Sequence, residues 1–125
     1  MKISAHTSVI YLLSSLITTP AIAAKPDKVL AEVSYLLSEI KHSPCKLKRN
    51  GTLHNGVAAE KHIRRKYNYA RSRIKSAEQF IAYTATKSSM SGIAYMLICN
   101  NNTPQTTASW LMNKLAIYRA TKSNQ

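Results

Sequence analysis

The chain has 125 residues, and its 18 Lys and Arg against five Asp and Glu give a formal net charge of +13 at pH 7. A chain of this length forms one domain with one modest core, which excludes deep clefts between domains unless the protein oligomerises. The two cysteines lack a paired C-x-x-C spacing and the histidines lack a ligand spacing, so we predict no metal site and no cofactor.

The first 23 residues are predicted to be a secretory signal peptide. Lys2 gives a positive start, residues 9–17 form an apolar run, and Ala21-Ile22-Ala23 matches an A-x-A cleavage signal. A membrane-spanning helix needs about 20 apolar residues, so cleavage is favoured over an uncleaved anchor. We expect cleavage after Ala23, with Ala24 as the second choice, and a mature domain of residues 24–125. The mature domain is predicted to be periplasmic or secreted, with no membrane span.

Export changes the interpretation of the charge and of the cysteines. Lys2 is the only basic residue of the leader, so the mature domain carries 17 basic and five acidic side chains, a net +12. For an exported protein the expected partners are lipid headgroups, envelope polymers or acidic proteins rather than nucleic acid. The alternative is that the charge only provides solubility. An even cysteine count in an oxidising compartment favours a Cys45–Cys99 disulfide over two buried thiols.

A helix followed by a hairpin is predicted at the start of the mature domain. The helix begins at Pro26 and ends before Ser43-Pro44, because the residue before a proline avoids helical geometry. Residues 45–49 alternate like a half-buried strand, Asn50-Gly51 is a strong hairpin signal, and residues 52–54 form the return strand.

The second predicted helix follows Asn55, a good N-cap. At 100° per residue its buried stripe consists of four residues, and a more polar row runs along one border. The stripe is Ile63, Tyr67, Ala70 and Ile74, and the border row is His62, Lys66, Tyr69 and Arg73.

The remaining elements complete an α+β fold of about four helices and a small antiparallel sheet built on the Asn50-Gly51 hairpin. Ser76 and Gln79 form a capping box for a third helix, residues 87–92 form a polar loop, and residues 94–99 form a strand. Thr107 is expected to cap a last helix that buries Leu111, Leu115 and Tyr118. If the strand ending at Cys99 pairs with the strand starting at Cys45, the two cysteines meet.

Several segments together resemble a family of small exported bacterial proteins of unknown function, the YfeK-like family. They cover nearly all of the mature domain and comprise RNG at 49–51, HIRRK at 62–66, RSRI at 71–74, SAEQFI at 76–81 and SSMSG at 88–92 with Tyr95. The resemblance implies export, one domain and this order of elements, but no reaction. Ile93-Ala94 stands where the family has a basic residue and a proline, which removes one positive charge beside the loop.

The candidate binding residues lie in these shared segments. They are Arg49, Asn50, His62, Lys66, Arg73, Ser88 and Ser89. Lys and Arg supply charge while His and Ser supply hydrogen bonds, as a site for a small anion or an acidic peptide requires. The alternative is architectural: Asn50 makes a turn, His62 and Arg73 satisfy backbone carbonyls, and the two serines terminate a helix.

A catalytic function has less support in the sequence. Ser88 or Ser89 would be the nucleophile and His62 the base, but a third group that orients the base is not evident. No nucleophile elbow or phosphate-cradling loop is present. The sequence therefore predicts a non-enzymatic binding or envelope-associated domain, with a hydrolase-like enzyme that uses His62 and a loop serine as the alternative.

Overall fold

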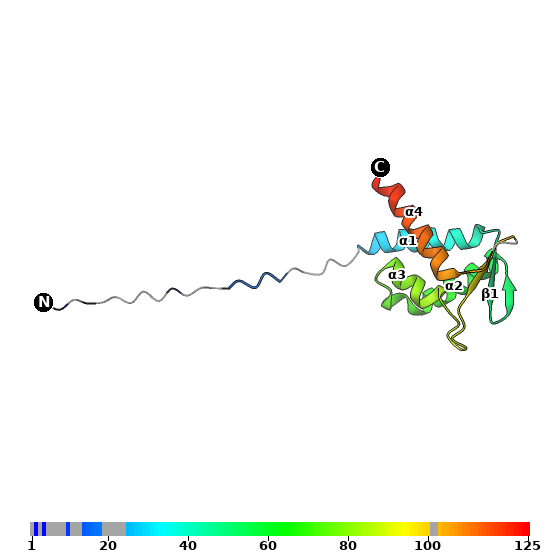
Figure 1. Ribbon diagram of the computed structural model, residues 1–125, viewed down its shortest axis with the longest axis horizontal. Helices are drawn as coiled ribbons and strands as arrows, with labels where there is room; N and C mark the ends of the chain where they lie inside the picture. The colour runs from blue at the N-terminus through cyan, green and yellow to red at the C-terminus, as the bar shows by residue number, and fades with distance from the viewer. Residues whose placement is uncertain (1, 3, 5–9, 11–13, 19–24, 101–102) are drawn as a thin grey trace.

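The computed structural model (Figure 1) describes residues 25–100 and 103–125 and, before them, residues 2, 4, 10 and 14–18. The predicted cleavage signal at 21–23 lies outside these residues, and residues 14–18 are exposed and belong to neither helix nor strand. Within the part of the chain that is described, no helix is long and apolar enough to cross a membrane.

The first helix and the hairpin lie where the sequence predicts them. Helix α1 (Pro26–His42) buries one apolar face, and strands β1 (Lys46–Arg49) and β2 (Thr52–His54) follow it. The turn between the strands has positive φ at both of its residues, 49° at Asn50 and 80° at Gly51. Asn and Gly tolerate this conformation better than other residues, which is why this dipeptide closes the hairpin.

The sheet has four antiparallel strands in the order β2-β1-β3-β4. Strand β3 (Met96–Ile98) pairs with β1, with Leu47 opposite Leu97. This register brings Cys45 and Cys99 together with their Cα atoms 4.3 Å apart, and the predicted disulfide joins them. The short edge strand β4 (Gln105–Thr106) was not predicted, because both of its residues are exposed and no apolar alternation marks it.

Helix α2 (Gly56–Ala70) starts directly against the end of α1. Asn55 caps it as predicted, because its side-chain oxygen accepts from the Ala58 amide at 2.9 Å. A Cβ atom at Gly56 would lie 2.5 Å from the carbonyl oxygen of Ile40, so this contact requires glycine. The helix ends at Ala70 and a 3₁₀ turn, η1 (Arg71–Arg73), follows, so the predicted stripe residue Ile74 is buried but lies beyond the helix.

The remaining helices confirm the third predicted start and correct the fourth. Ser76 caps α3 (Ala77–Phe80), which continues as a π-helical turn, η2 (Ile81–Ala85). Helix α4 (Thr107–Ser123) is capped by Thr106, which accepts from the Ser109 amide at 3.2 Å. The expectation that Thr107 is the cap was therefore wrong by one residue. Leu111 and Leu115 are buried as expected, whereas Tyr118 is only half-buried and stacks on Tyr35.

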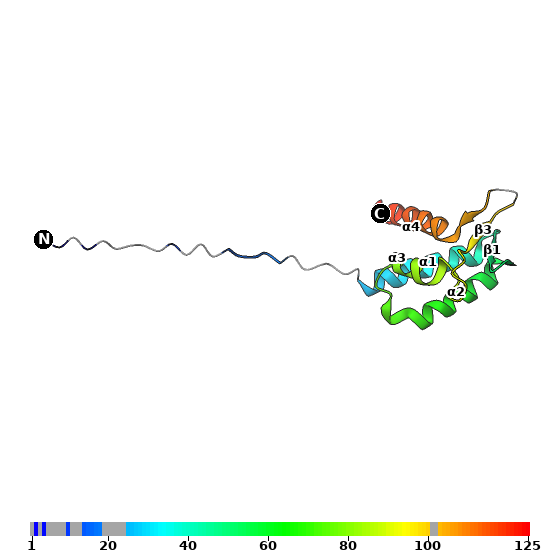
Figure 2. The same ribbon diagram turned by 60° about the horizontal axis from the view of Figure 1, so that its bottom comes forward.

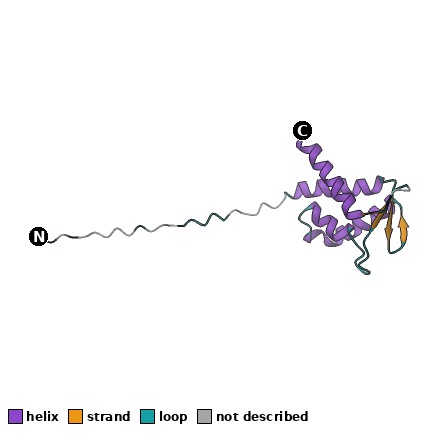
Figure 3. Cartoon of the chain, viewed as in Figure 1, coloured by secondary structure: helices purple, strands orange, loops and turns teal. Residues whose placement is uncertain are grey.

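The elements form a helical body with the sheet at one end (Figure 3). Turned by 60°, the domain shows α1 lying between α2 and α4 (Figure 2), which agrees with the contacts of α1 to both helices. The largest fully buried side chains include Tyr95, Phe80, Leu36 and Ile63, which come from four different elements or loops. The candidate site lies where α2, the hairpin and the 87–95 segment meet.

Candidate functional site

The predicted site residues gather where the hairpin, α2 and the 87–95 segment meet. Five of the seven take part in side-chain hydrogen bonds that connect these three parts of the chain: Arg49, Asn50, His62, Lys66 and Ser88. The other two, Arg73 and Ser89, line a neighbouring groove together with Lys66.

His62 lies at the centre of the hydrogen-bonded group. Arg49 Nη1 lies 3.1 Å from His62 Nδ1, and His62 Nε2 lies 3.0 Å from the hydroxyl of Tyr95. A guanidinium group only donates, so Nδ1 must accept, and Nε2 carries the proton and donates to Tyr95. Burial and the charges of Arg49 and Lys66 lower the pKa of His62 to about 4. The imidazole is therefore neutral at pH 7 with one defined tautomer.

Lys66 completes this group from the next turn of α2. Its ammonium donates to the Lys87 carbonyl at 3.0 Å and to the Tyr95 hydroxyl at 3.4 Å, and it lies 5.1 Å from the centre of the Tyr95 ring. Burial and the neighbouring Arg49 lower the pKa of Lys66, and burial raises the pKa of Tyr95. Tyr95, which is 1% exposed, thus ties α2 to the segment that leads into β3.

Asn50 and Ser88 shape the loop at 88–92. The Ser88 hydroxyl oxygen accepts from the amides of Met90 and Ser91 and from the side-chain amide of Asn50, each at 3.3 Å. Ser91 donates to the Asn50 side-chain oxygen at 2.6 Å, and Gly92, with φ of 72°, donates its N–H to the Ser88 carbonyl. These polar groups are used within the protein, so Asn50 and Ser88 position the loop.

A groove of about 420 Å³ lies beside this group, on the C-terminal half of α2. Besides Ala70, its lining consists of three cations, two tyrosines and one serine: Arg65, Lys66, Arg73, Tyr69, Tyr83 and Ser89. Among the residues that the structure describes, no acidic side chain lines it. Across residues 25–100 and 103–125, neither Arg65 nor Arg73 forms an ion pair with an acid. The groove thus presents positive charge that these parts of the protein do not neutralise.

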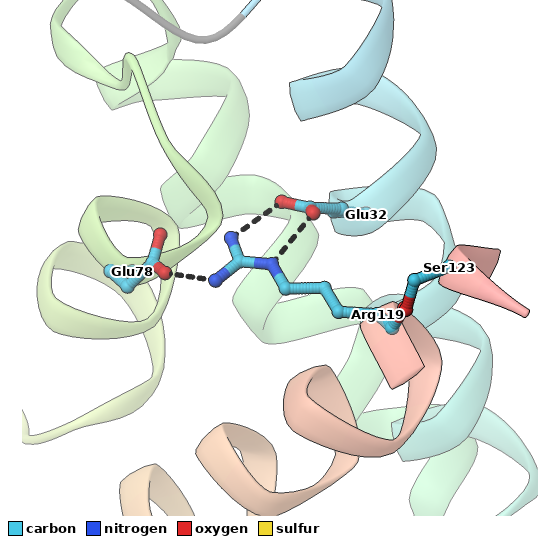
Figure 4. Close-up of polar contacts among 4 residues, drawn as sticks. All are labelled: Glu32, Glu78, Arg119 and Ser123. Carbon is cyan, nitrogen blue, oxygen red and sulfur yellow. Dashed lines mark hydrogen bonds and ion pairs between the residues drawn. The ribbon is translucent and has the colours of Figure 1, made fainter. Parts of the chain in front are cut away.

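The glutamates are paired elsewhere. Arg119 of α4 holds both carboxylate oxygens of Glu32, at 2.8 and 2.9 Å, and contacts Glu78 at 2.5 Å (Figure 4). Glu39 pairs with Lys114, and Glu60 pairs with Arg64. Because all four glutamates of the sequence are used in these pairs, they do not offset the charge of the groove.

Sequence reasoning found part of this surface. Lys66, Arg73 and Ser89 were predicted as binding residues, whereas Arg65 and Tyr83 were not. Tyr69 belongs to the predicted border row of the second helix, and that position on the helix was the signal that could have placed it beside Lys66 and Arg73. Tyr83 lies in the π-helical turn, where side chains point in other directions than in a regular α-helix. A regular helix pattern therefore does not predict that Tyr83 lines the groove.

The geometry gives little support to catalysis by His62 and a serine. Both ring nitrogens of His62 are occupied, by Arg49 and Tyr95, and the Ser88 hydroxyl oxygen accepts from the loop. Within the described residues, neither Ser88 nor Ser89 hydrogen bonds to His62. The same part of the chain contains no group of three or more His, Cys, Asp and Glu side chains that could hold a metal ion.

Comparison with known proteins shows a family, and the family has no described activity. The sequence model of a family described as "Family of unknown function (DUF5329)" matches residues 27–119. The chain is 36% identical over 81 residues to the uncharacterized protein YfeK of Salmonella typhimurium strain LT2, an alignment that covers 64% of this chain and 68% of that protein. No solved structure gives a significant match.

Proposed function

The chain belongs to the DUF5329 family of unknown function, and from that premise we propose that it is an exported domain that binds an anionic component of the cell envelope. The binding surface in this proposal is the groove lined by Arg65, Lys66, Arg73, Tyr69, Tyr83 and Ser89, called the basic groove below. In this proposal the protein has a binding role and no catalytic one.

Two features support export. The leader pattern at 1–23 contains a positive start, an apolar run too short to span a bilayer and a small-residue cleavage signal. The Cys45–Cys99 disulfide closes a loop of 54 residues, and structural disulfides persist in oxidising compartments such as the periplasm. In the proposal the mature domain is residues 24–125 and it is periplasmic or secreted.

The composition of the basic groove is the observation that carries the binding proposal. Three cations converge on it, no acidic side chain of the described residues lines it, and two of the cations, Arg65 and Arg73, are exposed. Guanidinium groups bind carboxylate and phosphate oxygens with two parallel hydrogen bonds, which favours them at anion sites. Tyr69, 87% exposed, and Tyr83, 51% exposed, add flat apolar faces with a polar tip beside those charges.

Charge reversal in matched pairs tests the binding proposal. The full chain is expressed in a Gram-negative host and recovered from the periplasm, where the mass of the product also reports cleavage near Ala23. Binding to poly-glutamate and to inorganic polyphosphate is then measured for wild type and for Arg65→Glu/Arg73→Glu. The control is Lys41→Glu/Lys46→Glu, an equal charge change at two exposed residues that do not line the groove.

The expected result is at least about tenfold weaker binding for the groove pair, because each lost contact to an anion contributes roughly 1 kcal/mol and the new charges repel it. The control pair is expected to lose much less. Equal losses in both pairs would mean that net charge binds the polymers diffusely, and would contradict a binding surface at the groove.

A further inference from the structure

The loop beside the basic groove ends in an exposed apolar tip. Lys87 and Ala94 pair across its base, and the segment between them projects from the domain (Figure 1). Met90 is 98% exposed and Ile93 is 58% exposed. Met90 lies outside the core of this domain, and together with Ile93 it places two exposed apolar side chains on one loop beside the basic groove.

The tip is held in a fixed arrangement. Ser88 accepts from the amides of Met90 and Ser91, Gly92 donates to the Ser88 carbonyl, and Asn50 holds Ser88 and Ser91 from the hairpin. The internal hydrogen bonds satisfy polar groups that insertion into an apolar environment would otherwise leave unpaired. A tip ordered in advance also loses little conformational entropy on binding.

The surroundings of the tip have the composition of an interfacial membrane surface. Ser89 belongs both to the loop and to the lining of the basic groove, so Met90 directly follows a groove residue. The groove adds its three cations and the amphipathic rings of Tyr69 and Tyr83. Basic residues attract anionic headgroups, tyrosines favour the headgroup level, and apolar side chains enter the boundary of the acyl chains.

We infer that the basic groove and the loop tip together dock on an anionic lipid surface. Met90 and Ile93 enter the boundary between headgroups and acyl chains, while the exposed Arg65 and Arg73 bind lipid phosphates. This inference rests on the proposed function and names the class of its anionic partner. A highly charged polymer would use the charges of the groove but would not require an ordered apolar tip beside them.

Vesicle binding tests the inference with matched variants. The protein, expressed as the full chain and purified from the periplasm, is sedimented with vesicles of phosphatidylglycerol mixed with phosphatidylcholine and with vesicles of phosphatidylcholine alone. We expect binding to the mixed vesicles and a loss of about tenfold or more for Met90→Asp, because a charge then replaces the methionine side chain that would be inserted in the lipid. Met112→Asp is the control, since Met112 is also exposed, at 43%, and carries the same charge change on α4.

A second readout reports insertion directly. The indole introduced by Met90→Trp is expected to shift its fluorescence to the blue on mixed vesicles relative to the background of Trp110, and brominated acyl chains are expected to quench it. Equal losses of binding for Met90→Asp and Met112→Asp, or an introduced indole whose emission stays that of a solvated side chain, would overturn the inference. Binding to polyphosphate without binding to vesicles would also overturn it while leaving the proposed function intact. Binding to neither would refute both.

Discussion

His62 donates from Nε2 to the hydroxyl oxygen of Tyr95 at 3.0 Å, and this contact joins α2 to the segment that leads into β3. With Arg49 donating to the other ring nitrogen, the imidazole is a neutral bridge between the Arg49 guanidinium and the Tyr95 hydroxyl. Through these contacts Arg49, His62 and Lys66 hold together the elements beside the basic groove. Arg65 and Arg73 are the exposed cations of the groove surface.

The protonation of His62 is expected to make stability depend on pH. The pKa of His62 is about 4 in the folded protein and 6.5 in an ordinary environment, so between these values the unfolded chain binds a proton that the native state does not. The stability that the protein gains from keeping His62 neutral is therefore fully present above about pH 6.5, and it is lost as the pH falls toward 4. Urea unfolding across this range should show that loss in wild type and a smaller one in His62→Gln. Identical profiles would contradict the assigned neutral state.

The Tyr95 hydroxyl is expected to contribute to stability through its two donors. Tyr95→Phe keeps the buried ring but removes the acceptor for His62 Nε2 and one of the acceptors for Lys66. The donors on His62 and Lys66 are half-buried, so the free energy of unfolding should fall by about 1 kcal/mol in denaturant titrations. Tyr69→Phe is the control, because Tyr69 is 87% exposed and its hydroxyl is free to bind water. A Tyr95→Phe protein as stable as the control would show that the contact is energetically neutral.

Among the ion-paired residues, Arg119 is expected to be the one whose replacement lowers the stability of the domain most. Its partner Glu32 has a side chain only 3% exposed, so Arg119→Met leaves a buried carboxylate without its cation. The expected loss is about 2–3 kcal/mol, below the range of a fully buried pair because the Arg119 side chain is 39% exposed. Lys114→Met breaks the pair with Glu39, in which both side chains are about a third exposed, and should cost less than about 1 kcal/mol. Similar losses in the two variants would contradict the assigned burial.

The disulfide is expected to supply a large part of the stability. Closing a loop of 54 residues corresponds to roughly 4 kcal/mol in the chain-entropy model. Cys45→Ser/Cys99→Ser should therefore unfold at much lower urea, and reduced wild type should match it. A thiol assay on denatured, unreduced periplasmic protein checks the pairing, and two free thiols would disprove it.

Local signals in the sequence predicted most of the fold. The positive φ values at Asn50 and Gly51 and the caps at Asn55 and Ser76 depend on a few neighbouring residues, so the sequence pattern is sufficient to locate them. Predicting that the two cysteines meet required one further assumption, that the strand starting at Cys45 pairs with the strand ending at Cys99. The observed register confirms this pairing.

Features that depend on distant contacts were not predictable in the same way. Glu32 and Arg119 are 87 residues apart, and only the packing of α4 on α1 brings them together. The available signal was the place of Glu32 one helical turn from Val29 and from Leu36 on the apolar side of α1, where a charge needs a partner. The contact between His62 and Tyr95 likewise depends on how the 87–95 segment folds back on α2.

The most direct test of the central claim is an NMR titration that maps the anion-binding surface. Backbone amide shifts of the ¹⁵N-labelled protein are followed as short polyphosphate is added at low salt. We predict that the largest changes fall at residues 65–73 and 83–89, which border the basic groove, and that they vanish in Arg65→Glu/Arg73→Glu. Largest changes along α1 or α4, or small changes spread evenly over the domain, would contradict a binding surface at this groove.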